Sequence, residues 1–267
     1  VETIKRDLSP ELTNKEIVAV KVFLEKAIKT GLSHMQRELP GRRIVEVSRR
    51  GKYLLLTLDD QKRLAFHLRM TGRLLYLPEE APLERHTSLI LKLNDGCDLR
   101  LVDQRKFGTV HLFSPEDPPK GLAELGPEPL EEEREALLTR LREAAARRKI
   151  SVKGLLLDQR LLAGLGNIYT DEALFMAGIR PSRLAKRLTA REWGRLYQAI
   201  CQVLAAGIEH RGTTRRDYVD GKGRPGDHQY YLKVYGRRNQ ACPVCGENIL
   251  YSRVAGRGTH YCPSCQK

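Results

Sequence analysis

The sequence predicts an α+β protein in which an N-terminal antiparallel β-sandwich is followed by a helical domain and a small C-terminal hairpin. Hydrophobic residues recur with period two up to about residue 114, which is typical of half-buried strands. Beyond residue 130 the period becomes helical, and the end of the chain contains two Cys-x-x-Cys pairs. The 267 residues are enough to bury two hydrophobic cores.

The first domain, residues 1–114, is expected to begin with a helix, because Ile4 and Leu8 lie one helical turn apart. Short alternating segments follow, separated by turn signals such as Asn94-Asp95-Gly96. This pattern is typical of an antiparallel sandwich or barrel. The predicted strands are residues 17–23, 44–47, 53–58, 64–68, 74–77, 88–93, 99–102 and 109–113.

A helical domain is expected at residues 131–235, after a proline-rich linker at residues 115–130. Residues 131–148 begin with acidic side chains and end with basic ones, which suits the dipole of a helix. Thr189 and Glu192 have the spacing of a capping box and predict the start of a long amphipathic helix.

The last segment, residues 236–267, has the spacing of a hairpin whose base is held by one structural Zn²⁺. The alternatives are two disulfides or four unrelated thiols. Near the tip, at residues 253–259, Arg257 stands between two glycines and would face an anionic partner. The expected zinc ligands are Cys242, Cys245, Cys262 and Cys265.

The chain carries 47 Lys and Arg against 33 Asp and Glu, a net charge of +14. Such an excess favours a polyanionic partner, nucleic acid first of all, although a basic surface can serve solubility alone. The sequence has neither an apolar run of about 20 residues nor a signal-peptide core, which excludes a membrane-spanning protein. Cys97 and Cys201 have no obvious partner, so we expect a reducing, cytoplasmic location near the nucleoid.

Residues 161–174 contain a second candidate anion site. Gly164 and Gly166 precede Asn167, which we expect to be the N-cap of a helix ending near Met176. The N–H groups of a helix start, lined by glycines, can bind a phosphate. The alternative is an ordinary cap after a flexible turn, because Gly-x-Gly is a weak signal.

Over essentially its whole length the sequence resembles the formamidopyrimidine-DNA glycosylases, bacterial base-excision-repair enzymes that act on 8-oxoguanine and ring-opened purines. The resemblance implies a β-sandwich, a helix-two-turns-helix domain and a zinc hairpin, with damaged double-stranded DNA bound by a monomer. The matching stretches are Gly51-Lys-Tyr-Leu-Leu-Leu56, His67-Leu-Arg-Met-Thr-Gly72, Asp103-Gln-Arg-Lys-Phe-Gly108, Leu125-Gly-Pro-Glu-Pro-Leu130, Gly164-Leu-Gly-Asn-Ile-Tyr169 and Gly256-Arg-Gly-Thr-His-Tyr-Cys-Pro-Ser-Cys-Gln266.

Such an enzyme must evert its target base and fill the hole that the base leaves. The resemblance implies that Met70, Arg105 and Phe107 do the filling, with a flexible thioether, a guanidinium that can bond the orphaned base and a wedging ring. For Met70 and Phe107 the alternative is core packing. The loop at residues 212–226, polar and glycine-rich, takes the place of the lesion-capping loop.

The resemblance also implies phosphate contacts by Lys52, His86, Arg105, Asn167 and Arg257, with Lys52 and Arg257 taking part in the lyase steps. Further DNA-binding candidates are the basic residues Arg148, Lys149 and Lys153 near a helix end, where the alternative is a solvated surface.

One departure from the family concerns the amino terminus. Family members begin with Pro-Glu-Leu-Pro-Glu ahead of the Val-Glu-Thr that starts this sequence, so the catalytic proline and glutamate precede Val1. We expect the native protein to carry them, and a chain without them to be inactive. The alternative functions are an endonuclease VIII-like glycosylase for oxidised pyrimidines, a non-catalytic binder of damaged DNA and, more distantly, a zinc-ribbon RNA-binding protein.

Overall fold

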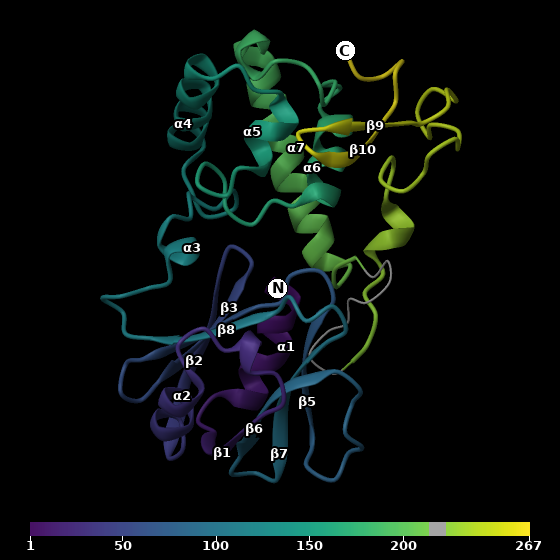
Figure 1. The fold of residues 1–267 in the computed structure, drawn as a ribbon. Coiled ribbons are helices and arrows are strands. Elements are labelled where there is room, and N and C mark those ends of the chain that lie inside the picture. The colour runs from purple at the N-terminus through teal and green to yellow at the C-terminus, as the bar shows by residue number, and fades with distance from the viewer. Residues whose placement is uncertain (214–222) are drawn as a thin grey trace. The chain divides into compact units, whose positions relative to one another are not determined.

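The computed structural model describes residues 1–213 and 223–267. The chain forms two compact units, each with its own core (Figure 1). Unit 1 comprises Val1–Ala123 and His210–Gln229, and unit 2 comprises Glu124–Glu209 and Tyr230–Lys267. Most of the predicted capping loop, residues 214–222, lies outside the described residues.

Unit 1 is built on an eight-stranded sheet in the order β5-β7-β6-β1-β2-β3-β4-β8, and every neighbouring pair is antiparallel. Each of the eight predicted segments forms a strand, so the prediction of an antiparallel β-domain is confirmed. The strands are β1 (Glu16–Val22), β2 (Arg42–Arg50), β3 (Tyr53–Leu58), β4 (Arg63–His67), β5 (Gly72–Pro78), β6 (Thr87–Leu93), β7 (Cys97–Asp103) and β8 (Thr109–Phe113).

The sheet divides into two halves that share one core. Strands β1 and β2 join the halves through a short ladder in which only Glu16 and Ile17 of β1 are aligned, with Arg43 and Arg42 of β2. Leucines from β5, β6 and β7 pack in the same cluster as leucines from β3 and β4, as expected of a sandwich.

Helix α1 (Glu2–Leu12) adds Ile4, Leu8 and Leu12, one turn apart, to this core. The predicted helix therefore exists and extends beyond Leu8. The other helical elements before residue 124 are η1 (Glu25–Ala27), α2 (Leu32–Glu38) and α3 (Lys120–Ala123), and α3 lies inside the segment predicted as a linker.

Unit 2 is helical, and its core contains α4 (Arg134–Arg147), α5 (Val152–Leu157), α6 (Asn167–Met176) and α7 (Ala190–Glu209). The predicted capping box begins α7: the Thr189 N–H donates to Glu192 Oε2 at 2.8 Å, and the Glu192 N–H donates to Thr189 Oγ1 at 3.3 Å. Helix α4 begins later than residue 131 because the Glu133 carboxylate caps it. The described residues also form two 3-10 turns, η2 (Ala185–Arg187) and η3 (His228–Tyr231), and η3 begins in the last residues of unit 1.

The C-terminal hairpin of unit 2 pairs β9 (Leu250–Val254) with β10 (Arg257–Tyr261). The turn residues Ala255 and Gly256 have φ values of 51° and 72°. Positive φ at both positions is the geometry of a tight type I′ turn. The predicted tip, with Arg257 directly after the turn, is therefore confirmed. In residues 1–213 and 223–267 no helix has both the length and the apolar character needed to cross a bilayer.

Candidate nucleic-acid interface

Three predicted site residues form an exposed cluster beside the unit 1 sheet, and we call Met70, Arg105 and Phe107 the Met70 cluster. Met70 follows β4, while Arg105 and Phe107 lie between β7 and β8. Arg105 Nη1 contacts the Met70 sulfur at 3.1 Å, and the guanidinium lies 5.0 Å from the centroid of the Phe107 ring. Met70 is 67% and Phe107 51% exposed, so the alternative that they pack in the core is wrong.

The backbone near this cluster is strained. Arg69, Lys106 and His86 have φ values of 56°, 58° and 69°, a left-handed conformation that is unfavourable for side chains with a Cβ. Such residues cost about 1–3 kcal/mol each, persist only where their surroundings dictate them, and are concentrated at functional sites. His86 is itself a predicted phosphate ligand, and the other two flank members of the Met70 cluster. Residue type alone did not indicate this strain.

Lys52 lies in the turn between β2 and β3 and influences His67 at the end of β4. Burial, and then the charges of Arg69 and Lys52, lower the pKa of His67 to about 4. The neutral ring accepts a hydrogen bond at Nδ1 from the backbone N–H of Arg69, at 3.1 Å. His67 thus fixes the backbone beside Met70. Its place in a family-like motif was visible in the sequence, but this role was not.

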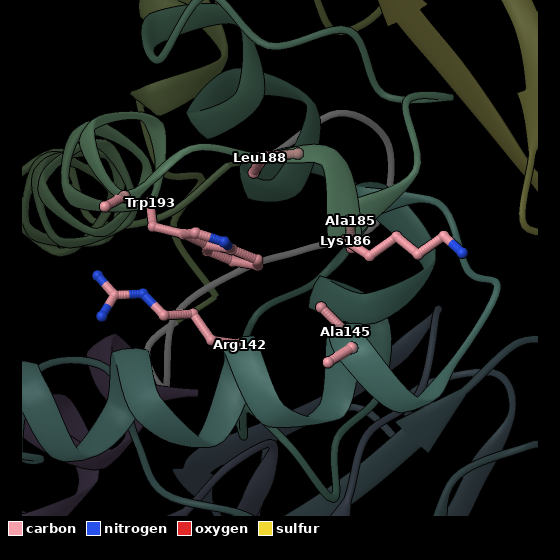
Figure 2. Close-up of a pocket in the computed structure, with 8 residues that line it drawn as sticks. Arg142, Ala145, Ala185, Lys186, Leu188 and Trp193 are labelled. Carbon is pink, nitrogen blue, oxygen red and sulfur yellow. The ribbon is translucent and has the colours of Figure 1, made fainter.

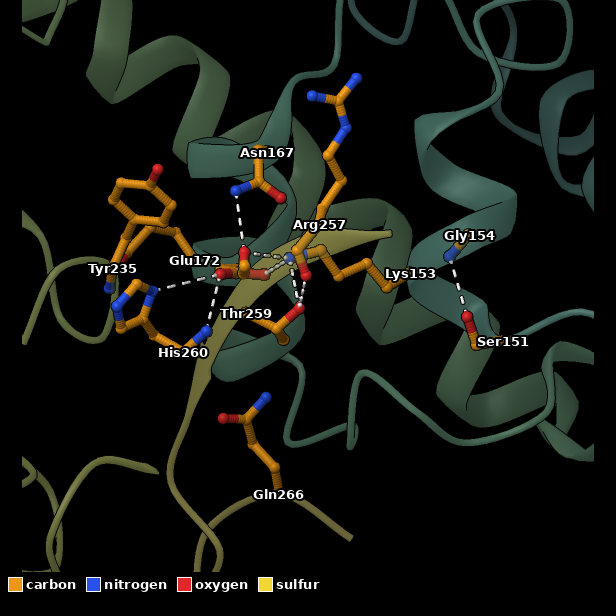
Figure 3. A network of polar contacts seen from close by, with 12 residues as sticks. Ser151, Lys153, Gly154, Asn167, Glu172, Tyr235, Arg257, Thr259, His260 and Gln266 are labelled. Carbon is orange, nitrogen blue, oxygen red and sulfur yellow. Dashed lines mark hydrogen bonds and ion pairs between the residues drawn. The ribbon is translucent and has the colours of Figure 1, made fainter. Parts of the chain in front are cut away.

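Arg257 is exposed at the hairpin tip in unit 2, and the backbone next to it is tied to two helices (Figure 3). The carbonyl oxygen of Gly258 accepts from Asn167 Nδ2 at 2.9 Å and from Lys153 Nζ at 3.1 Å. The guanidinium of Arg257 points away from this network. The tip therefore presents a cation on a fixed backbone.

The structure corrects the expected role of Asn167. Gly166, not Asn167, is the N-cap of α6, and no side chain caps the helix there. Asn167 is the first helical residue, and its amide reaches the hairpin because Gly258 lies within hydrogen-bond distance. Its Oδ1 is buried and has no hydrogen-bond partner among the described residues. An amide oxygen only accepts hydrogen bonds, so this atom needs a donor and cannot itself bind a phosphate at the helix start.

The prediction that Lys153 contacts DNA is wrong. Its side chain is fully buried, and Nζ donates to Asp171 Oδ1 at 2.5 Å and to Thr259 Oγ1 at 2.9 Å, besides the Gly258 carbonyl. Burial lowers the pKa of Lys153, and the Asp171 carboxylate opposes that shift. Asp171 also accepts from the backbone N–H of His260 at 2.9 Å. The pair therefore fastens the hairpin to α5 and α6. The sequence did not predict this role, because it depends on which residues face Lys153 in the fold.

Glu172, next to Asp171, holds the segment that leads into the hairpin. Its buried carboxylate accepts from the backbone N–H groups of Lys233, Val234 and Tyr235 at 2.8, 3.0 and 2.8 Å. Neighbouring acidic residues of α6 therefore anchor two different parts of the C-terminal region.

Arg148 and Lys149 lie directly after α4 and are exposed. Arg148 Nη1 is paired with Asp158 Oδ2 at 3.0 Å, while its side chain remains 44% exposed. Both residues stay predictions as DNA contacts, because exposure alone does not identify a DNA-binding side chain.

The four C-terminal cysteines come together as predicted. Their sulfurs lie within 4.8 Å of one another, with 3.9 Å between Cys242 and Cys265 and 3.5 Å between Cys245 and Cys262. Four ligands at about 2.3 Å around one ion give sulfur separations of this size. All six cysteines of the chain are free, so the disulfide alternative is wrong. The cluster can hold a metal ion.

A hollow of about 270 Å³ opens on another part of unit 2, and Figure 2 shows the residues around it. Trp193 of α7 and Arg142 of α4 line it, together with Lys186 and several alanines. None of the predicted site residues lines this hollow. It is not part of the candidate interface.

Comparison with known proteins covers both units. Residues 1–110 match the formamidopyrimidine-DNA glycosylase N-terminal domain, and residues 125–218 match the formamidopyrimidine-DNA glycosylase H2TH domain. The formamidopyrimidine-DNA glycosylase of Pelotomaculum thermopropionicum is 48% identical over 272 residues, with 100% of this chain and 97% of the relative covered. That of Moorella thermoacetica is 47% identical over 250 residues, covering 92% and 90%.

Solved structures of the Lactococcus lactis enzyme Fpg have the same fold. Its complex with abasic-site DNA aligns with a TM-score of 0.91 at 36% identity, covering 100% of this chain and 97% of that one. Its complex with Fapy-dG DNA gives 0.89 at 35% identity, covering 100% and 98%. Its complex with DNA containing an oxidised pyrimidine gives 0.91 at 35% identity, covering 100% and 97%. With both domain types matched and full-length relatives near half identity, the chain belongs to the formamidopyrimidine-DNA glycosylase family.

Proposed function

We propose that the protein removes 8-oxoguanine and formamidopyrimidines from duplex DNA and then cleaves the abasic site by β,δ-elimination. Membership of the family makes it a base-excision DNA glycosylase. The observation that carries the assignment of duplex DNA as the substrate is the Met70 cluster, because two large apolar side chains exposed beside an arginine are suited to insertion into a partner. The partner is damaged double-stranded DNA, bound by a monomeric enzyme in the bacterial cytoplasm.

The Met70 cluster has the chemistry needed to occupy the hole left by an everted base. The Phe107 ring can wedge between base steps, and the Met70 thioether can adapt to the remaining gap. Arg105 already lies against both side chains, so its guanidinium can meet the hydrogen-bonding edge of the orphaned base. The side chains would therefore stabilise the extruded state.

The phosphates around the lesion would be bound by Lys52, His86 and Arg105 in unit 1, and by Asn167 and Arg257 in unit 2. The support for Arg257 is its exposure on a backbone held by Asn167 and Lys153. The support for Asn167 is its place as the first residue of α6, a helix end whose free backbone N–H groups attract anions. Arg148 and Lys149 would add weaker, salt-sensitive contacts.

The nucleophile in this proposal is the α-amine of an amino-terminal proline, the group that the family resemblance implies. An α-amine has a pKa of about 7.7–8, so a useful fraction is neutral near pH 7. It attacks the sugar C1′ as the base leaves, and loss of the ring oxygen bond gives an iminium ion. That ion acidifies the neighbouring C2′–H, so the 3′ phosphate and then the 5′ phosphate can be eliminated. Lys52 and Arg257 would bind these leaving phosphates.

The metal in this proposal is one structural Zn²⁺, held by Cys242, Cys245, Cys262 and Cys265. Thiolates at tetrahedral spacing are a ligand set that zinc prefers. The bound ion would cross-link the two Cys-x-x-Cys segments at the base of the hairpin. The residues of the chain itself would make every contact with DNA.

Oxidised pyrimidines are a second candidate substrate, favoured by the Lactococcus lactis complex with such DNA. Excision assays on matched duplexes containing 8-oxoguanine, Fapy-dG or an oxidised pyrimidine would rank the lesions. We expect the purine lesions to be removed faster. A reversed order would replace the proposed substrate with the endonuclease VIII-like one.

The mechanism is tested by borohydride trapping with an 8-oxoguanine duplex. A chain extended by Pro-Glu-Leu-Pro-Glu before Val1 should form a covalent complex through its terminal proline, because an imine is reducible. A chain beginning at Val1 should bind the duplex without excision, since five helical residues shift the amine by roughly 7.5 Å. Equal excision by the two chains would show that the nucleophile is another group. It would also show that the chain beginning at Val1 is an active enzyme and rule out the alternative of a non-catalytic binder of damaged DNA.

A further inference from the structure

Asp103, the last residue of β7, has a buried carboxylate at the centre of the loops that carry the Met70 cluster. The residue is 1% exposed and lies opposite Gly72 in the β5–β7 ladder. Four donors reach its two oxygens: Thr71 Oγ1, the Arg105 N–H at 3.1 Å, the Phe107 N–H at 2.7 Å and the Gly108 N–H at 2.6 Å. Among the described residues, its carboxylate thus bonds one hydroxyl and three backbone N–H groups.

The two oxygens of the carboxylate have different partners. Oδ1 receives the Thr71 hydroxyl and the Arg105 N–H, and the same N–H also reaches Thr71 Oγ1 at 3.1 Å. This joins the residue after Met70 to the backbone of Arg105. Oδ2 receives the N–H groups of Phe107 and Gly108 and so turns the chain back toward β8. One carboxylate therefore orients the backbone at or beside all three side chains of the cluster.

The packing leaves little room for another arrangement. A Cβ on Gly108 would lie 3.2 Å from Asp103 Oδ2, and a Cβ on Gly72 would lie 2.3 Å from the Leu68 carbonyl oxygen. The N–H of Asp103 donates to the carbonyl oxygen of His86 at 3.0 Å. The strained backbones at Arg69, Lys106 and His86 therefore all lie in loops that Asp103 or its partner Thr71 touches or adjoins.

We infer that Asp103, acting with Thr71, is a positioning residue that sets the Met70 cluster in its DNA-inserting geometry before DNA arrives. The inference rests on the proposed function for what the cluster does. Side chains ordered in advance lose less conformational entropy on binding, so the benefit appears in lesion binding and in discrimination of the opposite base. Of the proposed phosphate contacts only the one made by Arg105 involves the cluster, so binding to undamaged duplex depends on the cluster much less.

The test is Asp103→Asn, which keeps the size of the side chain but replaces one acceptor oxygen with an NH₂ group. Either Thr71 and Arg105 or Phe107 and Gly108 then lose their acceptor. We expect affinity for a duplex with an abasic-site analogue to fall roughly tenfold or more, as when a buried polar group loses its partner. Affinity for undamaged duplex should change much less, because Arg105 supplies only one of the proposed phosphate contacts. Fluorescence anisotropy measures both, with each base in turn opposite the analogue.

Asp98→Asn is the matched control, because Asp98 is a second buried carboxylate of β7 that pairs with Arg100 and not with the cluster loops. It should lower stability without changing opposite-base discrimination. Thr71→Ser keeps the hydroxyl and should behave as the unmodified protein, whereas Thr71→Val should lose discrimination. The Thr71 pair decides the question if Asp103→Asn does not fold.

The outcomes separate this inference from the proposed function. If the unmodified protein does not prefer abasic-site DNA to undamaged DNA, the proposed function fails. If it does, but Asp103→Asn and Thr71→Val discriminate as well as the unmodified protein, only the positioning role is overturned. Equal loss of discrimination in Asp98→Asn would also overturn it, because the effect would then follow from sheet stability.

Discussion

The Met70 cluster of unit 1 and the hairpin tip of unit 2 both present an exposed arginine, but they are supported differently. The cluster lies on loops of an eight-stranded sheet with a large core, where one carboxylate, Asp103, organises the backbone. The hairpin has strands of five residues, and the core at its base is a small group that includes two of the cysteines. It depends on a buried Lys153–Asp171 pair and on the cysteine cluster.

The difference shows that the size of the scaffold determines the kind of anchor. The sheet holds both ends of a loop that connects two of its strands, so a few hydrogen bonds are enough to specify the backbone path of that loop. A two-stranded hairpin is only marginally stable by itself and needs further cross-links.

Removal of the proposed metal should disorder the hairpin while unit 1 stays folded. Structural zinc contributes about 10–16 kcal/mol to the folding of small zinc domains, far more than any single contact here. Chelation, or Cys262→Ser, should abolish most DNA binding and leave the unfolding of the sheet domain unchanged. Cys97→Ser is the control, because Cys97 is outside the cluster. Unchanged DNA affinity after Cys262→Ser would contradict the dependence.

Breaking the buried ion pair should be the next largest effect. Lys153→Met leaves the Asp171 carboxylate buried without its cation, which costs about 3–5 kcal/mol. Replacing both residues, as Lys153→Met with Asp171→Leu, should recover much of that loss because no charge remains buried. Thermal unfolding of the two variants measures this. A double variant no more stable than the single one would show that the pair does not act as a unit.

Acid should weaken unit 1 through His67. Its folded pKa of about 4 lies below its ordinary value of 6.5, so the unfolded chain binds the proton more tightly. This contribution to stability is fully present above pH 6.5 and is lost as the pH falls toward 4, a total of about 3 kcal/mol. Replacing His67 with Gln should flatten the dependence of the unfolding free energy on pH in this window. If the unfolding free energy of the variant depends on pH as steeply as before, other groups cause the loss of stability in acid.

The two exposed arginines should differ in how they affect binding. Arg105→Ala should mainly remove discrimination of the base opposite the lesion, by about 1–3 kcal/mol, since contacts with base edges carry sequence information. Arg257→Ala should weaken binding to all duplexes and reduce the salt slope by about 0.9, the effect of one phosphate contact. Titrations across salt and opposite base distinguish these. Identical effects from the two variants would contradict the proposal that Arg105 contacts a base and Arg257 contacts a phosphate.

The smallest expected effect is at the hairpin turn. Gly256→Ala has space for its methyl group, but it forces a Cβ into φ 72°, at a cost of about 1–2 kcal/mol. Ala255→Gly should be neutral or slightly stabilising, because Ala255 already has φ 51°. Hydrogen exchange of the β9 and β10 amides reports the local change. A larger loss for Ala255→Gly than for Gly256→Ala would show that the turn type does not limit the hairpin.

Local patterns in the sequence determined the elements of this protein. The eight strands, the capping box at Thr189 and the hairpin tip at Arg257 were predictable because they depend on alternation, spacing and turn residues within a few positions. The cysteine cluster was predictable because two close pairs of thiols restrict the geometry. The family-like motifs also led to the Met70 cluster.

The tertiary structure alone decided which polar groups meet. Lys153 was expected at the surface, but it donates to the carbonyl oxygen of Gly258, 105 positions along the chain. Asn167 was expected to cap α6, but its side chain donates to the same carbonyl oxygen, 91 positions away. Asp103 reaches Thr71 across 32 positions because β5 and β7 are neighbours in the sheet. Such contacts follow from strand order and helix packing, which bring distant residues together, and residue type by itself does not encode the partner.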